Sequence, residues 1–304
     1  MPVVIPAYAG PERRKAPRWR PRPVRALVLL LGLVVLGYAG SVIWLMTQET
    51  RLVFRAGETL AAGRPPFPYE QLDIRRTDGA RQFAWRMPLP SPESSPWVLF
   101  LHGNASTIAS HVNISHYRLL RGAGLNVFAP EYRGFSGLEG TPTEETLAVD
   151  ARAAYDYLTG PGRVPPSRLV VYGWSLGSAV AVRLAAEVPQ AAVILEGAPA
   201  SLTDIGRRRY PFFPIQLLMR SKFESVGKVH RIRAPLLFLH SADDEVIPIA
   251  EGRRLYEAAR GPKQFVQVSG GHVGASEGDD GRFASAIATF LQQHGITSTP
   301  AAHP

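Results

Sequence analysis

Three observations predict an α/β fold: a mostly parallel sheet with helices on both faces, preceded by one membrane-spanning helix. Short apolar runs alternate with helical stretches over most of the chain. Within these runs the hydrophobicity is continuous, which is typical of parallel strands covered on both faces. An uncharged apolar run, residues 26–46, precedes them all. Strand–helix alternation of this kind makes a doubly wound sheet.

The run 26–46 is long enough to cross a bilayer core of about 30 Å. Tyr38 and Trp44 lie toward its far end, where amphipathic rings favour the membrane interface. Basic residues cluster before it, which predicts a cytoplasmic N-terminus and places the bulk of the chain on the exported side. A cleaved signal peptide is the alternative, but the run is long for one and no clear cleavage site follows.

The composition excludes several classes of function. The chain has 304 residues and no cysteine, so thiol catalysis, disulfides and cysteine-bound metals are ruled out. The net charge is +9, and the basic N-terminus could bind nucleic acid. The adjoining apolar run favours a membrane instead, so we expect no nucleic-acid partner. The chain is rich in alanine, arginine and proline, a composition typical of bacteria with GC-rich genomes. We therefore expect the membrane to be a bacterial inner membrane.

The chain divides into five predicted segments. They are a disordered basic tail (1–23), a transmembrane anchor (24–46), a connector (47–70), one α/β domain (71–294) and a disordered tail (295–304).

Eight strands are expected in the domain. Two of them form a hairpin around Asp78–Gly79. The six others are the apolar runs 97–103, 125–132, 168–174, 191–197, 235–241 and 264–270. The predicted helices cover 141–158, with Thr143 as its cap, 176–187, 249–260 and 281–295. His111 and His116 have no evident carboxylate partner and are expected at the surface.

The segment Gly173–Gly177 reads Gly-Trp-Ser-Leu-Gly between a strand and a helix. This is a G-x-S-x-G pattern in the context that makes it credible, a tight strand-to-helix turn that exposes a nucleophile. The helix that follows Ser175 turns its free N–H groups toward developing negative charge. We therefore expect Ser175 to be a catalytic nucleophile, although the turn could also be a plain connection.

A nucleophilic serine needs a base and an orienting acid. Asp243, Asp244 and Glu245 follow the strand 235–241, and His272 follows the last strand between glycines. The carboxyl ends of parallel strands meet at one edge of the sheet, so these groups are expected to lie together. Each could alone be an ordinary surface residue, but their order along the chain favours a triad.

Two backbone N–H groups are expected to form an oxyanion hole. One belongs to Leu176, and the other to Asn104 in the loop after strand 97–103, where Gly103 permits close approach. His102 belongs to the same loop and is expected to be structural.

Together these motifs resemble the α/β-hydrolase superfamily, and within it the single-pass, membrane-anchored α/β-hydrolase-domain proteins. The resemblance covers roughly residues 50–294. It rests on LHGNAS (101–106), EYRGFSGLEGTPTEE (131–145), YGWSLGS (172–178), APLLFLHSADDEVIP (234–248) and GGHVGA (270–275).

The resemblance implies serine-ester hydrolase chemistry without a metal or organic cofactor. It assigns the nucleophile to Ser175, the base to His272 and the acid to Asp244, with Asp243 as the fallback. The chain departs from the family pattern at Ser106 and Ser241, where glycines are usual.

We therefore expect a membrane-anchored serine hydrolase that cleaves carboxylic esters, lipid-like ones included. A catalytically silent scaffold that binds a partner at the membrane is the alternative. The segment 203–225 mixes aromatic and aliphatic residues with arginines. It could form an apolar pocket beside a bilayer, or a helix packed on the sheet with a solvated basic face.

Overall fold

A computed structural model describes residues 10, 23–57, 62–76, 78–277 and 281–297. The chain divides into two compact units, Met1–Leu45 and Met46–Pro304. Nearly all of the expected N-terminal tail and most of the expected C-terminal tail lie outside the described residues, so both tails stay predictions.

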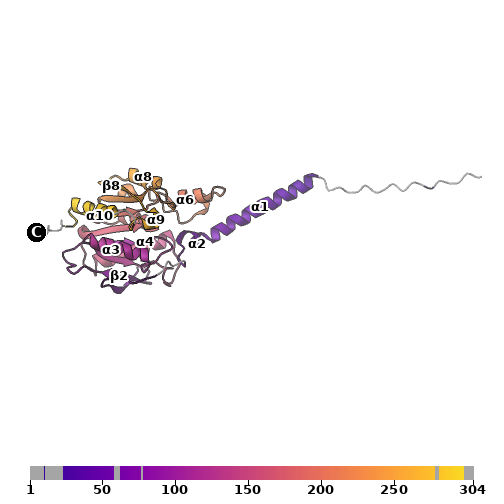
Figure 1. Cartoon of the computed structure of the whole chain (residues 1–304). Helices are drawn as coiled ribbons and strands as arrows, with labels where there is room; N and C mark the ends of the chain where they lie inside the picture. Colours follow the sequence, from indigo (N-terminus) through magenta and orange to yellow (C-terminus); the bar gives the residue numbers. More distant parts are fainter. Residues whose placement is uncertain (1–9, 11–22, 58–61, 77, 278–280, 298–304) are drawn as a thin grey trace, which may run out of the picture. The chain divides into compact units, whose positions relative to one another are not determined.

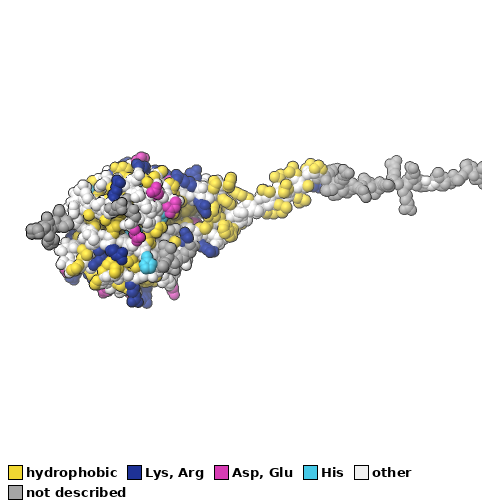
Figure 2. All heavy atoms as spheres, viewed as in Figure 1, with side chains coloured by type: hydrophobic (Ala, Val, Ile, Leu, Met, Phe, Trp, Pro, Cys, Tyr) yellow, Lys and Arg dark blue, Asp and Glu magenta, His cyan; other side chains and the backbone are white. Residues whose placement is uncertain are grey.

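The described part of the first unit is residue 10 and helix α1 (Pro23–Thr47), whose last two residues belong to the second unit. Its mean hydropathy reaches 2.5, and it is long and apolar enough to cross a membrane by length and composition. Most of its leucines and valines are exposed, as the yellow spheres of Figure 2 show, whereas Leu45 near its C-terminal end is buried.

The second unit is built on one eight-stranded sheet in the order β1-β2-β4-β3-β5-β6-β7-β8. The β1–β2 and β2–β4 pairs are antiparallel, and all others are parallel. The strands are β1 (Glu70–Arg75), β2 (Arg81–Met87), β3 (Trp97–Leu101), β4 (Asn126–Pro130), β5 (Leu169–Trp174), β6 (Ala192–Glu196), β7 (Leu236–Ser241) and β8 (Lys263–Val268). All eight predicted strands are confirmed, including the hairpin at Asp78–Gly79.

Helices cover both faces of this sheet (Figure 1). The longer ones are α3 (His111–Gly122), α4 (Glu144–Thr159), α5 (Leu176–Ala185), α8 (Ile249–Ala258) and α10 (Arg282–Gln293). Shorter ones are α2 (Glu49–Phe54), α6 (Leu202–Arg209), α7 (Ile215–Leu218), α9 (Gly271–Gly274) and the 3₁₀ turns η1 (Pro166–Arg168) and η2 (Val229–Arg231). Thr143 caps α4 as predicted, in a reciprocal capping box with Thr146.

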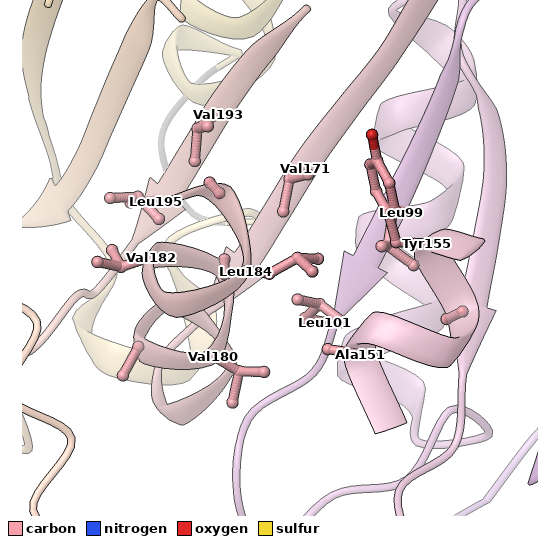
Figure 3. Close-up of a cluster of buried hydrophobic side chains, with 14 of the residues drawn as sticks. Leu99, Leu101, Ala151, Tyr155, Val171, Val180, Val182, Leu184, Val193 and Leu195 are labelled. Carbon is pink, nitrogen blue, oxygen red and sulfur yellow. The ribbon is translucent and has the colours of Figure 1, made fainter. Parts of the chain in front are cut away.

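The strands bury both of their faces. Alternate residues of β3, such as Leu99 and Val98, belong to two separate apolar clusters. The first cluster lies between the sheet and α4, α5 and α8, and the second between the sheet and α3 and α10. Figure 3 shows part of the first, where Leu195 and Val171 of the sheet lie beside Val182 and Leu184 of α5. This double burial explains why the strands read as continuous apolar runs.

Two parts of the second unit differ from expectation. The segment 47–70, expected as a connector, contains α2, whose Phe54 is fully buried in the first cluster. Helix α3 was not predicted, and it buries His116, which is 1% exposed. The prediction that His116 lies at the surface is therefore wrong, because the side chain faces the sheet rather than solvent.

Candidate active site

The turn at Ser175 joins β5 to α5 and requires its two glycines. A Cβ atom at Gly177 would lie 2.0 Å from the carbonyl oxygen of Leu101, and one at Gly173 would lie 2.4 Å from that of Gly177. Ser175 itself has φ 54° and ψ −122°, a strained conformation for a residue with a side chain. Close packing of the turn against β3 thus holds the serine at the carboxyl edge of the sheet.

The structure brings Ser175, His272 and Asp244 together in one chain of hydrogen bonds. The Nε2 atom of His272 lies 2.8 Å from Oγ of Ser175, and its Nδ1 atom lies 2.7 Å from Oδ2 of Asp244. Since the carboxylate accepts the Nδ1 proton, the Nε2 lone pair faces the serine hydroxyl. The three residues are 4%, 8% and 9% exposed, so the chain is largely shielded from water.

Asp244 is held as a carboxylate. Burial alone would raise its pKa, but hydrogen bonds from His272 and from the backbone N–H groups of Ile247 and Val246 outweigh burial and lower the pKa. Asp243, the fallback acid, is exposed and has no contact with His272 among the described residues. The geometry therefore favours Asp244 as the partner of His272.

Ser241 and Glu245 hold the loop that carries His272. The Oγ atom of Ser241 accepts the backbone N–H of Gly271 at 3.1 Å, and Glu245 accepts that of His272 at 3.3 Å. The serine that departs from the family pattern thus links the loop after β7 to the loop after β8.

The two predicted oxyanion donors flank Ser175. Leu176 is the first residue of α5, where a backbone N–H has no partner within the helix. The second donor, Asn104, follows Gly103. The backbone of Gly103 lies so close to Ser175 that a Cβ at position 103 would be 3.1 Å from the Cβ of Ser175. Within the part of the chain that the structure describes, neither Leu176 nor Asn104 donates its backbone N–H to another group.

His102 is fully buried and supports this loop. Its Nε2 lies 2.8 Å from a carboxylate oxygen of Glu131, and its Nδ1 donates to the carbonyl of Gly103. Glu131 also accepts the hydroxyl of Ser136 and the N–H of Ile108. These contacts agree with the expected structural role of His102.

A second buried cluster lies beside Ser175, His272 and Asp244 and was missed from the sequence. Glu196, at the end of β6, accepts hydrogen bonds from His116 at 2.8 Å and from the hydroxyl of Tyr172. His116 also donates Nδ1–H to the carbonyl of Val112 at 2.6 Å. Burial alone would lower the pKa of His116, but Glu196 and the Val112 carbonyl raise it above its usual value.

This cluster touches the triad through Trp174 and the backbone of β6. The Trp174 ring lies 5.5 Å from the ring of His116 and 6.0 Å from that of His272. The backbone N–H of Ser175 donates to the carbonyl of Glu196 at 2.9 Å. The only sign of this cluster in the sequence was Glu196, which precedes a glycine at the end of a strand. Its partner His116 lies 80 residues away along the chain.

Among the residues that the structure describes, no group of three His, Asp or Glu side chains could hold a metal ion. The hydrogen-bonded site itself offers a hydroxyl, an imidazole, a carboxylate and backbone donors. Such a set can transfer an acyl group through a covalent intermediate.

Comparisons with known proteins agree with this fold. A model of the alpha/beta hydrolase family matches residues 98–225. An uncharacterised Mycobacterium tuberculosis protein is 34% identical over 290 residues, which are 92% of this chain and 98% of that protein. An Arabidopsis thaliana protein named as alpha/beta hydrolase domain-containing is 31% identical, over 67% of this chain and 71% of its own length.

A solved structure of a Pyrococcus furiosus esterase aligns with a TM-score of 0.64 and 22% identity. The alignment covers 77% of this chain and 97% of the esterase. At this identity the likeness shows the fold alone.

Proposed function

This chain belongs to the α/β-hydrolase family, and we propose that it is a membrane-anchored serine hydrolase that cleaves carboxylic esters. One observation carries the proposal: the unbroken hydrogen-bond chain from Ser175 through His272 to Asp244. The buried ionised acid and the strained serine turn are what nucleophilic catalysis needs.

In the proposed reaction, Oγ of Ser175 attacks the ester carbonyl while Nε2 of His272 takes its proton. Asp244 holds the imidazole in the right tautomer and stabilises its charged form. The N–H groups of Leu176 and Asn104 bind the oxyanion. His272 then gives its proton to the leaving alcohol, and water hydrolyses the acyl-enzyme by the reverse path. These steps use only groups of this chain and need no metal or organic cofactor.

Apolar side chains next to the triad support an apolar ester as substrate. Val246 and Val273, which are 50% and 48% exposed, lie two residues and one residue beyond Asp244 and His272. Exposed aliphatic residues beside a catalytic group favour the binding of a hydrocarbon chain. We therefore propose lipid-like esters within the substrate class.

Helix α1 supports the anchor. Most of its apolar side chains are exposed, and a helix of this kind is stable in lipid rather than in water. With the basic residues on its N-terminal side, we propose a cytoplasmic N-terminus and an exported catalytic domain at a bacterial inner membrane.

The test is covalent labelling of the full-length protein in detergent with a fluorophosphonate probe, followed by turnover of p-nitrophenyl esters of increasing chain length. Ser175→Ala should abolish labelling and lower kcat by at least about a thousandfold. Ser285→Ala, at an exposed position of α10, is the matched control and should leave both unchanged.

Labelling that persists in Ser175→Ala would contradict the assignment of the nucleophile. A well-folded wild-type protein that is never labelled would instead favour the silent scaffold.

A further inference from the structure

We propose that the segment 202–220, which we call the cap segment, docks together with α2 onto an anionic phospholipid bilayer. The proposal rests on the membrane anchor of the proposed function but not on the chemistry at Ser175.

The cap segment presents two large apolar side chains to solvent. Phe212 and Leu217 are 84% and 79% exposed, in and after the turn between α6 and α7. The segment is nevertheless ordered, since Ile215 is buried and the N–H of Phe213 donates to the carbonyl of Tyr210 at 3.1 Å. A fixed turn that projects a phenyl ring and an isobutyl group is suited to insertion among lipid chains.

Positive charge surrounds these apolar side chains. Arg207 and Arg208 pair with Asp204 and Glu251, and they are counterbalanced within the protein. Arg209 and Arg220 are exposed, and in the described part of the chain neither side chain forms an ion pair. Guanidinium groups beside exposed apolar residues match the phosphates and acyl chains of an anionic lipid surface.

Helix α2 ties the cap segment to the place where the apolar run ends. Glu49 accepts the backbone N–H groups of Arg220 at 2.9 Å and Ser221 at 2.7 Å. Phe54 packs edge-on against Phe223, with ring centroids 6.1 Å apart. Both contacts lie within the second unit, at the end of it that carries α2 and α6 (Figure 1).

Covalent geometry then limits how far the cap segment can lie from a membrane. The apolar run ends at residue 46, and a chain spans at most about 3.5 Å per residue, so Glu49 lies within ~11 Å of that end. This is close to the Debye length of about 8 Å at physiological salt, so charges near Glu49 sense the potential of a lipid surface. Figure 2 shows Lys and Arg spheres beside hydrophobic ones at this end of the domain.

The same helix holds one wall of the catalytic site. The side-chain amide of Asn104 donates to the carbonyl of Val53 at 2.9 Å, and the N–H of Ala105 donates to that of Phe54 at 3.1 Å. Docking of α2 and the cap segment would therefore hold the oxyanion loop close to the lipid surface, where an ester substrate of the bilayer resides.

The chain has no cysteine, so single cysteines can report on its surface. Full-length Leu217→Cys and Phe212→Cys are labelled with an environment-sensitive dye and reconstituted in vesicles of phosphatidylcholine, with or without 30% phosphatidylglycerol. Brominated lipids measure contact of the dye with acyl chains. The control is Ser94→Cys. Ser94 is exposed and precedes the amino end of β3, whereas the cap segment follows the carboxyl end of β6.

In the anionic vesicles, brominated lipid should quench the dyes at positions 212 and 217. In the neutral vesicles this quenching should be much weaker. The dye at position 94 should be quenched in neither kind of vesicle. Adding Arg209→Glu and Arg220→Glu should weaken docking at least about 20-fold, because each basic residue near such a surface contributes roughly a fivefold factor. High salt should act in the same direction.

Quenching at 212 and 217 no stronger than at 94 would overturn the proposal, and so would equal quenching in neutral and anionic vesicles. Fluorophosphonate labelling of the same samples reports on Ser175 separately. Quenching without fluorophosphonate labelling would refute the proposed hydrolase activity but support the docking surface. Labelling without quenching would refute the docking surface but support the hydrolase activity.

Discussion

The glycines around Ser175 are explained by close backbone approach. Gly177 lies against the carbonyls of Leu101 and His102, so even one methyl group would push β3 away from α5. The same contact holds the loop of Asn104 beside Ser175. The two halves of the candidate oxyanion hole are therefore positioned by one packing contact.

We expect Gly177→Ala to lower the free energy of unfolding by about 3 kcal/mol or more, since the new Cβ would overlap backbone that cannot move cheaply. Gly122→Ala is the matched control: a Cβ there meets nothing within 4 Å. Urea unfolding of the two proteins in detergent checks this, and equal stabilities would contradict the close-approach explanation.

The buried pair His116–Glu196 predicts a pH-dependent stability. The pKa of His116 is raised in the folded protein, so the folded state favours its charged form. This stabilisation is complete below the unfolded pKa of about 6.5 and is lost as the pH rises through the raised folded pKa.

Glu196→Gln removes the charge that raises this pKa. The wild type should exceed the variant in stability most at about pH 6, and the difference should narrow toward pH 9. Urea midpoints across this range measure the difference. A difference that stays constant with pH would show that the pair does not titrate as inferred.

Helix α2 shows how a short element can act through its contacts. It has only six residues, too few to be stable alone, yet it bonds to the cap segment and to the oxyanion loop. From the sequence the region 47–70 was expected to be a connector between the apolar run and the domain.

Glu49→Ala should leave the N–H groups of Arg220 and Ser221 without their acceptor. We expect the hydrogen exchange of these two N–H groups to accelerate about tenfold, because they lose a hydrogen bond to a charged, partly exposed carboxylate. Glu257→Ala, at an exposed position of α8, should leave exchange in this segment unchanged. Exchange followed by mass spectrometry distinguishes the two, and equal rates would argue against this role of α2.

Considered as a whole, the second unit contains its own sheet, both apolar clusters and the candidate site. A chain that starts at Met46 should therefore fold, unfold cooperatively and react with fluorophosphonate within about twofold of the full-length rate. A chain that starts at residue 62 lacks α2 and Phe54, and it should be less stable and label more slowly. If the Met46 chain failed to fold, α1 would be part of the folding unit.

Much of this architecture could be predicted from local patterns. Buried parallel strands read as apolar runs because both faces are covered, and the turn at Ser175 has glycines because two backbones meet there. The chain order of Ser175, Asp244 and His272 follows from the order of the strands that carry them. Helix α3 was missed because its buried face includes the polar residues Asn113 and His116, and Glu196, the partner of His116, lies 80 residues away.

The sequence by itself thus determined the sheet, the candidate triad residues and the apolar run, since each depends on neighbours along the chain. Only the tertiary structure decided that Asp244 rather than Asp243 meets His272, that His116 is buried against Glu196, and that α2 joins the cap segment to the oxyanion loop. Such contacts join residues from 28 to 172 positions apart, and which distant side chains meet depends on how the layers pack.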